Sequence, residues 1–358
     1  MKPGESGSLP LDSRLRMPAE WAPHEATWLS WPHELTDWPG KFSPIPWAFA
    51  EIVRHLVPVE RVFLIVENRA AETRVRKLLA KAGVALEAVT FFHIPTDRGW
   101  MRDSGPMGVT ARETGELALL HFSFNAWAKY HNYKKDVRVA ALANRQLKLP
   151  LILPEHKARR IVLEGGAIDV NGCGTLLTTE ECFLSSVQSR NPGFTRDDYE
   201  EIFCRYLGST NVLWLKRGIA GDDTHGHVDD LARFVDSRTV VTVVEQNPAS
   251  PNYEPLQENL QLLRGMKDQD GWPLRVETLP MPKPVYFAGQ LLPASYANFY
   301  IANKIVLVPI FNDPADRVAL NTLAGLFPDR EIVPIYCRDL VLGLGTIHCM
   351  TQQLPRLG

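Results

Sequence analysis

The chain has 358 residues, of which 45% are hydrophobic and 22% charged, and its formal net charge is −2. This length and apolar content allow one large core or two smaller ones. The near-neutral charge excludes the basic surface that nucleic-acid binding requires, and the longest apolar runs, such as 303–311, are too short to span a bilayer. Neither nucleic acid nor a membrane is therefore expected as a partner.

Residues 1–16 form a polar lead without a hydrophobic core, which we expect to be a flexible segment and not a signal peptide. The five cysteines show no C-x-x-C spacing, which favours free thiols in the cytoplasm over a disulfide framework. Four of them are expected to be small buried hydrophobic residues: Cys173, Cys182, Cys204 and Cys337. We expect residues 17–358 to form a single domain. Monomer and homo-oligomer are both left open.

Short β-branched or aromatic runs alternate with segments of helical spacing along the chain. The runs expected to form strands are 26–31, 61–66, 89–94, 117–124, 175–179, 211–215, 239–244, 304–310 and 331–335. The segments expected to form helices are 47–57, 70–83, 195–208 and 316–327. Thr195 is the expected N-cap of the third helix. This alternation, without a linker that divides it, predicts an α/β or α+β fold.

Polar and glycine-containing segments recur at intervals of about sixty residues. They surround Asp103, Glu164, His227 and, two intervals later, Cys349. The skipped position falls near residue 288, and one step back from Asp103 reaches the end of 28–42. This recurrence predicts five supersecondary units around one centre, each contributing one loop to it, and chance spacing is the alternative.

The segment "DDTHGHVDD" (222–230) offers three interpretations. If it is extended, His225, His227 and Asp229 lie on one face because side chains alternate along a strand. These residues could bind a metal, as in a metal-dependent hydrolase, or His227 could be a general base oriented by Asp229. A polar turn before a strand at 231–235 is the third interpretation. The lack of a second ligand cluster disfavours the metal.

The motif "GLGTIHC" places His348 directly before Cys349 near the end of the chain. In an extended segment adjacent side chains point to opposite faces, so His348 is expected to be structural and His227 to be the better base for the thiol. Gly343 and Gly345 would let the backbone approach a ligand. A buried, unreactive thiol is the alternative.

Two carboxylates add to this set, although each has an ordinary interpretation. Asp103 belongs to "GWMRDSGP", where a surface turn would explain it, and Glu164 ends an apolar run, where a solvated strand end would explain it. Buried together beside Cys349, unpaired carboxylates would raise the pKa of the thiol unless the substrate brings a cation. A guanidinium is such a cation, since it is planar and pairs with carboxylates through two N–H groups.

Several motifs together resemble those of agmatine deiminases, guanidine-modifying enzymes similar to the Porphyromonas-type peptidyl-arginine deiminases. They are "MPAEWAPHEATWLSWP", "RDSGP", "EGGAI", "GDDTHGHVDD" and "TIHCMTQQLP", and the resemblance runs from about residue 17 to 355. It implies a five-bladed pseudo-symmetric α/β propeller (a pentein) that forms one catalytic domain, with no metal or organic cofactor. It also implies a small cationic guanidine substrate, with agmatine hydrolysed to N-carbamoylputrescine and ammonia through a covalent thiouronium on cysteine.

The resemblance also implies roles for the residues that match the motifs. Cys349 would be the nucleophile and His227 the acid/base. Asp103 and Asp229 would bind the guanidinium, so that Asp229 contacts substrate and does not orient His227. Glu164 would orient His227 or contact the substrate.

Trp100 matches an aromatic residue of the family's pocket, and Gly345 is expected beside the substrate. Departures from the usual motifs leave agmatine, free arginine and peptidyl-arginine open as substrates; they lie at His225, Asp230, Leu344 and Thr346. The loops expected to cap the pocket are those near Trp21, Trp31 and Trp127. A non-enzymatic binding module is the remaining alternative.

Overall fold

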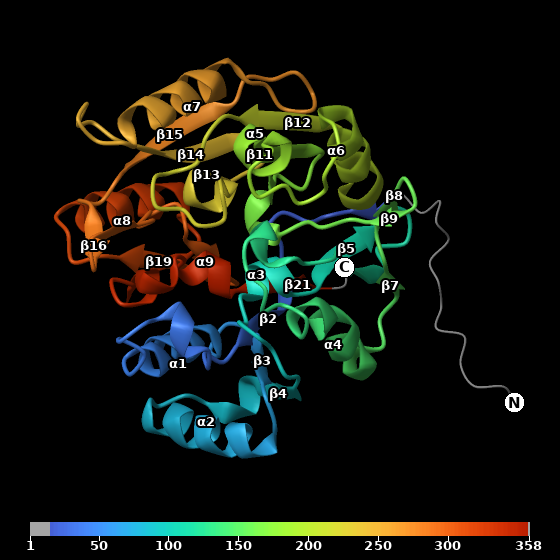
Figure 1. Ribbon diagram of the computed structural model, residues 1–358, viewed down its shortest axis with the longest axis vertical. Coiled ribbons are helices and arrows are strands. Elements are labelled where there is room, and N and C mark those ends of the chain that lie inside the picture. The colour runs from blue at the N-terminus through green and yellow to red at the C-terminus, as the bar shows by residue number, and fades with distance from the viewer. Residues whose placement is uncertain (1–14, 357–358) are drawn as a thin grey trace, which may run out of the picture.

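The computed structural model describes residues 15–356 and shows an α/β fold with mixed sheets (Figure 1). Five sheets have three or four strands each. In spatial order the sheets are β1 (Leu15–Arg16), β5 (Met107–Ala111), β6 (Leu117–Leu120) and β7 (Leu151–Ile152); β10 (Asp169–Val170), β11 (Thr175–Thr179) and β12 (Asn211–Leu215); β13 (Ala232–Phe234), β14 (Thr239–Val244) and β15 (Arg275–Pro280); β18 (Tyr300–Ile301), β19 (Ile305–Ile310) and β20 (Glu331–Tyr336); and β21 (Gln352–Pro355), β2 (His24–Ser30), β3 (Arg61–Val66) and β4 (Val89–His93). Two hairpins complete the strands: β8 (Glu155–His156) with β9 (Arg159–Arg160), and β16 (Val285–Phe287) with β17 (Gln290–Leu292).

Helices connect the strands, and several short ones lie where chain segments enter the centre of the molecule. The α-helices are α1 (Ile45–Leu56), α2 (Arg69–Lys81), α3 (Met101–Ser104), α4 (Val139–Leu147), α5 (Glu180–Leu184), α6 (Arg196–Ile202), α7 (Tyr253–Gly265), α8 (Ala315–Leu326) and α9 (Ile347–Met350). The 3-10 and π segments are η1 (Leu35–Asp37), η2 (Leu86–Ala88), η3 (Ala126–Ala128), η4 (Asp136–Arg138), η5 (Gly165–Ala167), η6 (Phe203–Leu207), η7 (Val228–Asp230) and η8 (Leu340–Gly343). Figure 1 shows α3 and α9 near the middle of the view, between the sheets.

One pairing pattern repeats in all five sheets. An antiparallel pair is followed by a parallel pair: β5/β6 then β6/β7, β10/β11 then β11/β12, β13/β14 then β14/β15, β18/β19 then β19/β20, and β21/β2 then β2/β3. The shared strands are apolar and largely buried because both faces are covered, as is usual for strands in parallel pairing. This repeated unit accounts for the interval of about sixty residues between the polar segments.

All nine predicted strands and all four predicted helices are present. The strands β3, β11, β12 and β14 have the predicted bounds, and the other elements have shifted ends. The strand predicted over 117–124 ends at Leu120, because its neighbour β7 ends at Ile152 and beyond it pairing continues through an isolated bridge at Ser123. Thr195 caps α6 in a reciprocal arrangement with Asp198. Helices α4 and α7 were not predicted.

Three expectations about local structure are wrong. Leu15–Arg16, assigned to the flexible lead, pairs with β5, while residues 1–14 lie outside the described residues. The segment 225–229 is not extended, because His225 has a left-handed φ of 67° and η7 begins at Val228. The segment around Cys349 is also not extended, since it forms the single turn of α9.

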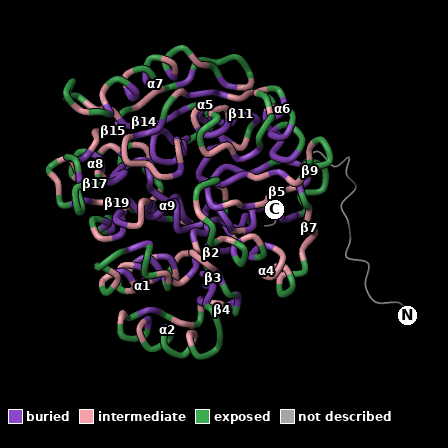
Figure 2. Tube along the Cα trace, viewed as in Figure 1, coloured by how far each residue is buried: buried purple, intermediate pink, exposed green. Residues whose placement is uncertain are grey.

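The core follows the strands and the short central helices (Figure 2). Cys182 and Cys337 are buried as predicted, but Cys173 and Cys204 are exposed. Cys173 lies between β10 and β11, in a turn, and Cys204 lies on an outer face of η6, so neither position reaches the core. Across residues 15–356, none of the helices has the length and apolar character needed to cross a bilayer.

Candidate active site

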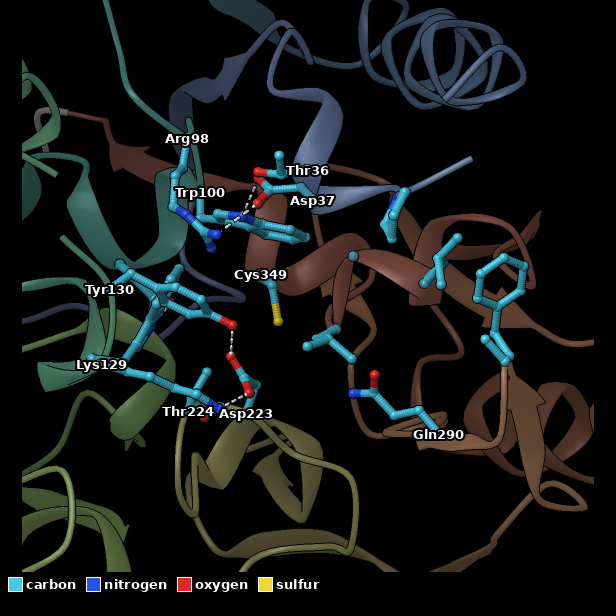
Figure 3. A pocket seen from close by; sticks show the side chains of 18 residues that line it. Thr36, Asp37, Arg98, Trp100, Lys129, Tyr130, Asp223, Thr224, Gln290 and Cys349 are labelled. Atoms are coloured by element: carbon cyan, nitrogen blue, oxygen red, sulfur yellow. Dashed lines mark hydrogen bonds and ion pairs between the residues drawn. The ribbon is translucent and has the colours of Figure 1, made fainter. Parts of the chain in front are cut away.

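A cavity of about 530 Å³ opens at the centre of the molecule, with the Cys349 side chain pointing into it (Figure 3). Its walls come from segments near the positions of the sixty-residue repeat, including the position near residue 288 that was inferred from spacing alone. The lining residues include Asp37, Arg98, Trp100, Asp103, Trp127, Lys129, Tyr130, Asp223, Phe287, Gln290, Leu344 and Cys349. Of the three tryptophans expected to cap the pocket, Trp127 lines it; Trp31 lines a different cavity.

Cys349 sits on α9, and Gly345 makes room for it. A Cβ on Gly345 would lie 2.9 Å from the Cβ of Cys349 and 2.9 Å from the Trp100 ring, so a larger residue would displace the Cys349 side chain. The equivalent atom on Gly343 would lie 2.7 Å from the indole of Trp38. A side chain at Gly343 would therefore collide with the core, while Gly343 itself lines the cavity.

The surroundings of Cys349 favour its neutral thiol. Burial raises the pKa of this thiol well above its ordinary value, and the carboxylates of Asp229, Asp230 and Asp103 raise it further. The sulfur lies 3.6 Å from Oδ2 of Asp229. A thiolate here needs a cation that the protein itself does not place beside the sulfur.

Asp103 is buried on α3 and is held by neutral donors. Its Oδ2 accepts a hydrogen bond from Trp127 Nε1 at 2.9 Å, and its Oδ1 accepts one from the backbone N–H of Gly166 at 3.1 Å. Burial raises the pKa of Asp103 to about 6, although the nearby His227 acts in the opposite direction. The surface turn considered from the sequence is thus wrong, since the carboxylate faces the cavity.

His227 lies among three carboxylates and is 1% exposed. Its Nδ1 is 3.9 Å from Asp103 Oδ1 and 4.0 Å from Asp229 Oδ1, and its Nε2 is 3.9 Å from Glu164 Oε2. Burial opposes protonation, but Asp103, Cys182 and Glu164 outweigh it and hold the pKa of His227 well above its ordinary value. The neighbouring acidic groups therefore favour the protonated form of the ring.

Glu164 differs from Asp103 because it has a cation of its own. The guanidinium of Arg190 donates from Nε to Glu164 Oε1 at 3.0 Å, and both side chains are fully buried. Burial raises the pKa of Glu164, but Arg190 and His227 outweigh this and bring it to about 2. Glu164 is therefore a permanent anion beside the His227 ring, and the solvated strand end considered from the sequence is wrong.

Gly166 lets three of these groups converge. A Cβ at this position would lie 2.5 Å from His227 Nδ1 and 3.1 Å from both Asp103 Oδ1 and Asp229 Oδ2. Only a residue without a side chain fits there without moving one of them. The role of Gly166 was not predicted, although the Gly-Gly pair after Glu164 was a visible signal.

The carboxylate of Asp229 is held in place by its contact with the ring of His348. Its Oδ2 faces His348 Nδ1 at 2.7 Å, while the other ring nitrogen of His348 faces Oε2 of Glu20 at 2.9 Å. Burial raises the pKa of Asp229, but the hydrogen bond from His348 and the positive charges of His348, His227 and Arg233 together outweigh it, so the pKa is lowered. His348 is thus structural, as predicted, but because its ring is engaged by two carboxylates and not because of strand alternation. Glu20 was not predicted.

The predicted metal ligands do not assemble. The ring of His225 turns away from His227 and Asp229, with Nε2 3.1 Å from the hydroxyl of Ser185. Two other groups of buried side chains within residues 15–356 have ligand atoms within 4.8 Å of one another: Glu164, Cys182 and His227, and Asp229, Asp230 and Cys349. In the first group Arg190 already neutralises Glu164, which disfavours a second cation.

The outer part of the cavity contains acids that are paired with bases. Asp37 accepts from Trp100 Nε1 at 3.1 Å and forms an ion pair with Arg98 at 3.1 Å. Across the cavity, Asp223 forms an ion pair with Lys129 and accepts from the Tyr130 hydroxyl at 2.5 Å (Figure 3).

Comparisons with known proteins identify the family of the chain. Residues 16–355 match the model of the Porphyromonas-type peptidyl-arginine deiminase family. A Latilactobacillus sakei protein that carries the provisional name agmatine deiminase is 35% identical, over 97% of both chains. The solved structure of an Enterococcus faecalis agmatine deiminase is 32% identical and has a TM-score of 0.89 over 98% of this chain and 99% of that one. A C. jejuni agmatine deiminase with substrate bound is 29% identical and has a TM-score of 0.85, over 96% of both chains. The chain belongs to the Porphyromonas-type peptidyl-arginine deiminase family.

Proposed function

We propose that the protein hydrolyses the guanidinium group of agmatine to N-carbamoylputrescine and ammonia, with Cys349 as nucleophile. The observation that carries this proposal is the buried thiol at the base of a cavity, next to two carboxylates, Asp103 and Asp229, that form no ion pair with a lysine or arginine among the described residues. His227 is 3.9 Å from Asp103 and 4.0 Å from Asp229, and His348 contacts only Oδ2 of Asp229. Asp103 is bound by neutral N–H donors, and Oδ1 of Asp229 has no hydrogen-bond partner among the described residues. A guanidinium would supply the missing positive charge and the matching N–H groups.

Binding comes first in the proposed reaction. The guanidinium pairs with Asp103 and Asp229, and the Trp100 ring packs beside its plane. Its positive charge lowers the pKa of the Cys349 thiol, which loses its proton to solvent. The carboxylates that suppress the thiolate in the free enzyme thus become the groups that hold the activating cation.

The thiolate then attacks the central carbon of the guanidinium, and a C–S bond forms. The imidazolium of His227 transfers its proton to the departing nitrogen, the C–N bond breaks, and ammonia leaves. The product of this step is a thiouronium cation on Cys349 and a neutral His227. Glu164 keeps the His227 ring oriented throughout.

Water completes the cycle. Neutral His227 accepts a proton from the water as its oxygen bonds to the thiouronium carbon. The C–S bond then breaks, the thiolate returns, and the released proton is taken up by ammonia. The sum is guanidinium plus water giving a ureido group and ammonium, with His227 again protonated. Cys349 regains from solvent the proton that it lost on substrate binding when the product leaves.

The family resemblance favours agmatine, and the outer cavity offers Asp37 and Asp223 for its terminal ammonium. Free arginine is the second candidate, because the bases Arg98 and Lys129 at the same end could accept an α-carboxylate. We also propose that the five sheets form the blades of a propeller and that the protein acts in the cytoplasm, in polyamine synthesis.

Ammonia release with agmatine, free arginine and a peptidyl-arginine tests this proposal. We expect release from agmatine and none after Cys349→Ser, because a hydroxyl in this acidic site cannot be ionised. Cys337→Ser is the matched control, because Cys337 is also a buried thiol but lies outside the cavity lining. Activity retained by Cys349→Ser, or release from none of the three compounds, would refute the proposal.

A further inference from the structure

Asn298 lies between β17 and β18, beside the nucleophile, and is 1% exposed. Its side-chain oxygen accepts hydrogen bonds from the Thr346 hydroxyl at 2.7 Å and from the backbone N–H of His348 at 3.1 Å. A third contact, from the N–H of Cys349, is 3.5 Å long. One amide oxygen thus receives the donors of the chain segment that carries Cys349.

These donors fix the orientation of the amide. A hydroxyl and a backbone N–H must face the oxygen, so the NH₂ group has to point the opposite way. There it lies 3.1 Å from the Cys349 sulfur and 3.0 Å from Oδ1 of Asp230. The two N–H groups of Asn298 therefore donate to the sulfur and to Asp230, and the bond to Asp230 prevents the amide from rotating.

Asn298 is a stabilising neighbour in an otherwise unfavourable environment for a thiolate. Asp103 on α3 and both Asp229 and Asp230 on η7 raise the pKa of the thiol, whereas the hydrogen bond from Asn298 lowers it. In the thiol state the S–H faces Asp229 Oδ2. When the proton leaves, that contact becomes repulsive, while the bond from Asn298 becomes charge-assisted and stronger.

We propose that Asn298 is a further catalytic residue, which donates an N–H to the Cys349 sulfur and stabilises it as the attacking and the departing thiolate. The inference rests on the proposed role of Cys349 as nucleophile. Asn298 acts at both ends of the cycle, because the same sulfur carries negative charge before the C–S bond forms and after it breaks. The second N–H, on Asp230, keeps the donor in place during the intervening covalent state.

The variant Asn298→Asp separates this role from a structural one. It keeps an oxygen for Thr346 and for the His348 N–H, but it places a second oxygen, in place of the donor, against the sulfur. The double variant Asn298→Asp with Asp230→Asn restores both the formal charge and the hydrogen bond between positions 298 and 230. It still lacks the N–H that Asn298 donates to Cys349.

The measurement is the rate of Cys349 alkylation by iodoacetamide against pH without substrate, with the labelled peptide identified by mass spectrometry. A hydrogen bond to a charged group of ordinary strength predicts a midpoint raised by about one unit or more and alkylation at pH 8 slowed about tenfold or more. We expect this in both the single and the double variant, with the double variant melting close to the wild type. kcat should fall in parallel.

Asn303→Asp is the matched control, because Asn303 also clamps two chain segments, through hydrogen bonds with the backbone of His24, away from the sulfur. It should lower the melting temperature without moving the thiol titration. Alkylation of Cys349 at the wild-type rate in the double variant would overturn the role of Asn298. That outcome is independent of the proposed reaction, whose failure would appear as absent ammonia release by the wild-type protein.

Discussion

The two ends of the cavity use carboxylates in opposite ways. At the inner end, Asp103 is buried against neutral donors, and the nearest cation, His227, stands 3.9 Å away. At the outer end, Asp37 and Asp223 each form an ion pair with a base of the cavity wall, Arg98 or Lys129. The inner end is therefore incomplete without a bound cation, whereas the outer end is neutralised by the protein itself.

This difference gives the two ends separate roles. In the proposed reaction, the inner carboxylates bind the group that reacts, and the outer ion pairs select the tail of the substrate. Burying charge without a close partner destabilises the fold, so the inner carboxylates are explained by what they bind and not by what they contribute to stability. The ion pair of Asp223 and Lys129 can exchange partners with the tail of a substrate at little cost, because it is partly exposed to solvent, whereas the pair of Asp37 and Arg98 is buried. Changes at the inner end should hence affect turnover far more than changes at the outer end.

The largest expected effect of a substitution is at Asp103. Asp103→Asn keeps the shape but removes the charge that faces the guanidinium, and breaking a desolvated ion pair costs about 3–5 kcal/mol. We expect kcat/KM for agmatine to fall by more than about a hundredfold, measured by steady-state ammonia release. Asp37→Asn is the matched outer substitution and should cost far less; equal losses from the two would contradict the comparison.

The pH dependence of kcat/KM should also show the ionisation of Asp103. Because the pKa of Asp103 is raised to about 6, this acid is protonated below that pH and cannot pair with a cation. The thiol of Cys349 has a pKa well above its ordinary value, so its ionisation raises kcat/KM over the whole range. As the pH rises through about 6, the slope of log kcat/KM against pH should therefore decrease by one, because above this pH only the ionisation of Cys349 still increases kcat/KM.

Asp37 provides a control for this profile, since burial raises its pKa to about 6 as well. The break should persist in Asp37→Asn and disappear in the residual activity of Asp103→Asn. The reverse result would assign the essential ionisation to the outer end.

The smallest effect is expected where the ion pairs are exposed. Asp223→Asn should raise KM for agmatine about three- to tenfold with little change in kcat, because it removes one partner of the tail ammonium. Lys129→Met should leave agmatine nearly unchanged or improve its KM, since it removes a competing cation from Asp223. If Lys129→Met instead lowers kcat/KM for arginine more than for agmatine, Lys129 selects substrates whose tail carries a carboxylate.

Much of this arrangement could be predicted from the sequence because strand patterns and loop spacing are local or periodic. The spacing of polar segments pointed to residue 288, and Ala288 does line the cavity. Cys349, His227, Asp103, Asp229 and Glu164 were all named, and the structure brings their side chains together, while their roles stay predictions.

What could not be predicted depends on contacts between distant segments. Asn298 reaches Cys349 across 51 positions of sequence, and Glu20 reaches His348 across 328. The extended conformations expected at His227 and Cys349 were wrong because tertiary packing bends both segments into single helical turns. The conformation of a short polar segment at the centre of this molecule is therefore set by its tertiary contacts and not by its local sequence pattern.

The raised pKa of the Cys349 thiol has a consequence for how easily the protein is oxidised. Peroxides oxidise thiolates and react slowly with thiols. An enzyme that forms its thiolate when a cationic ligand is bound would pass through oxidative stress with its sulfur intact while substrate is scarce. By the same reasoning, a covalent inhibitor would need a positive charge next to its reactive carbon.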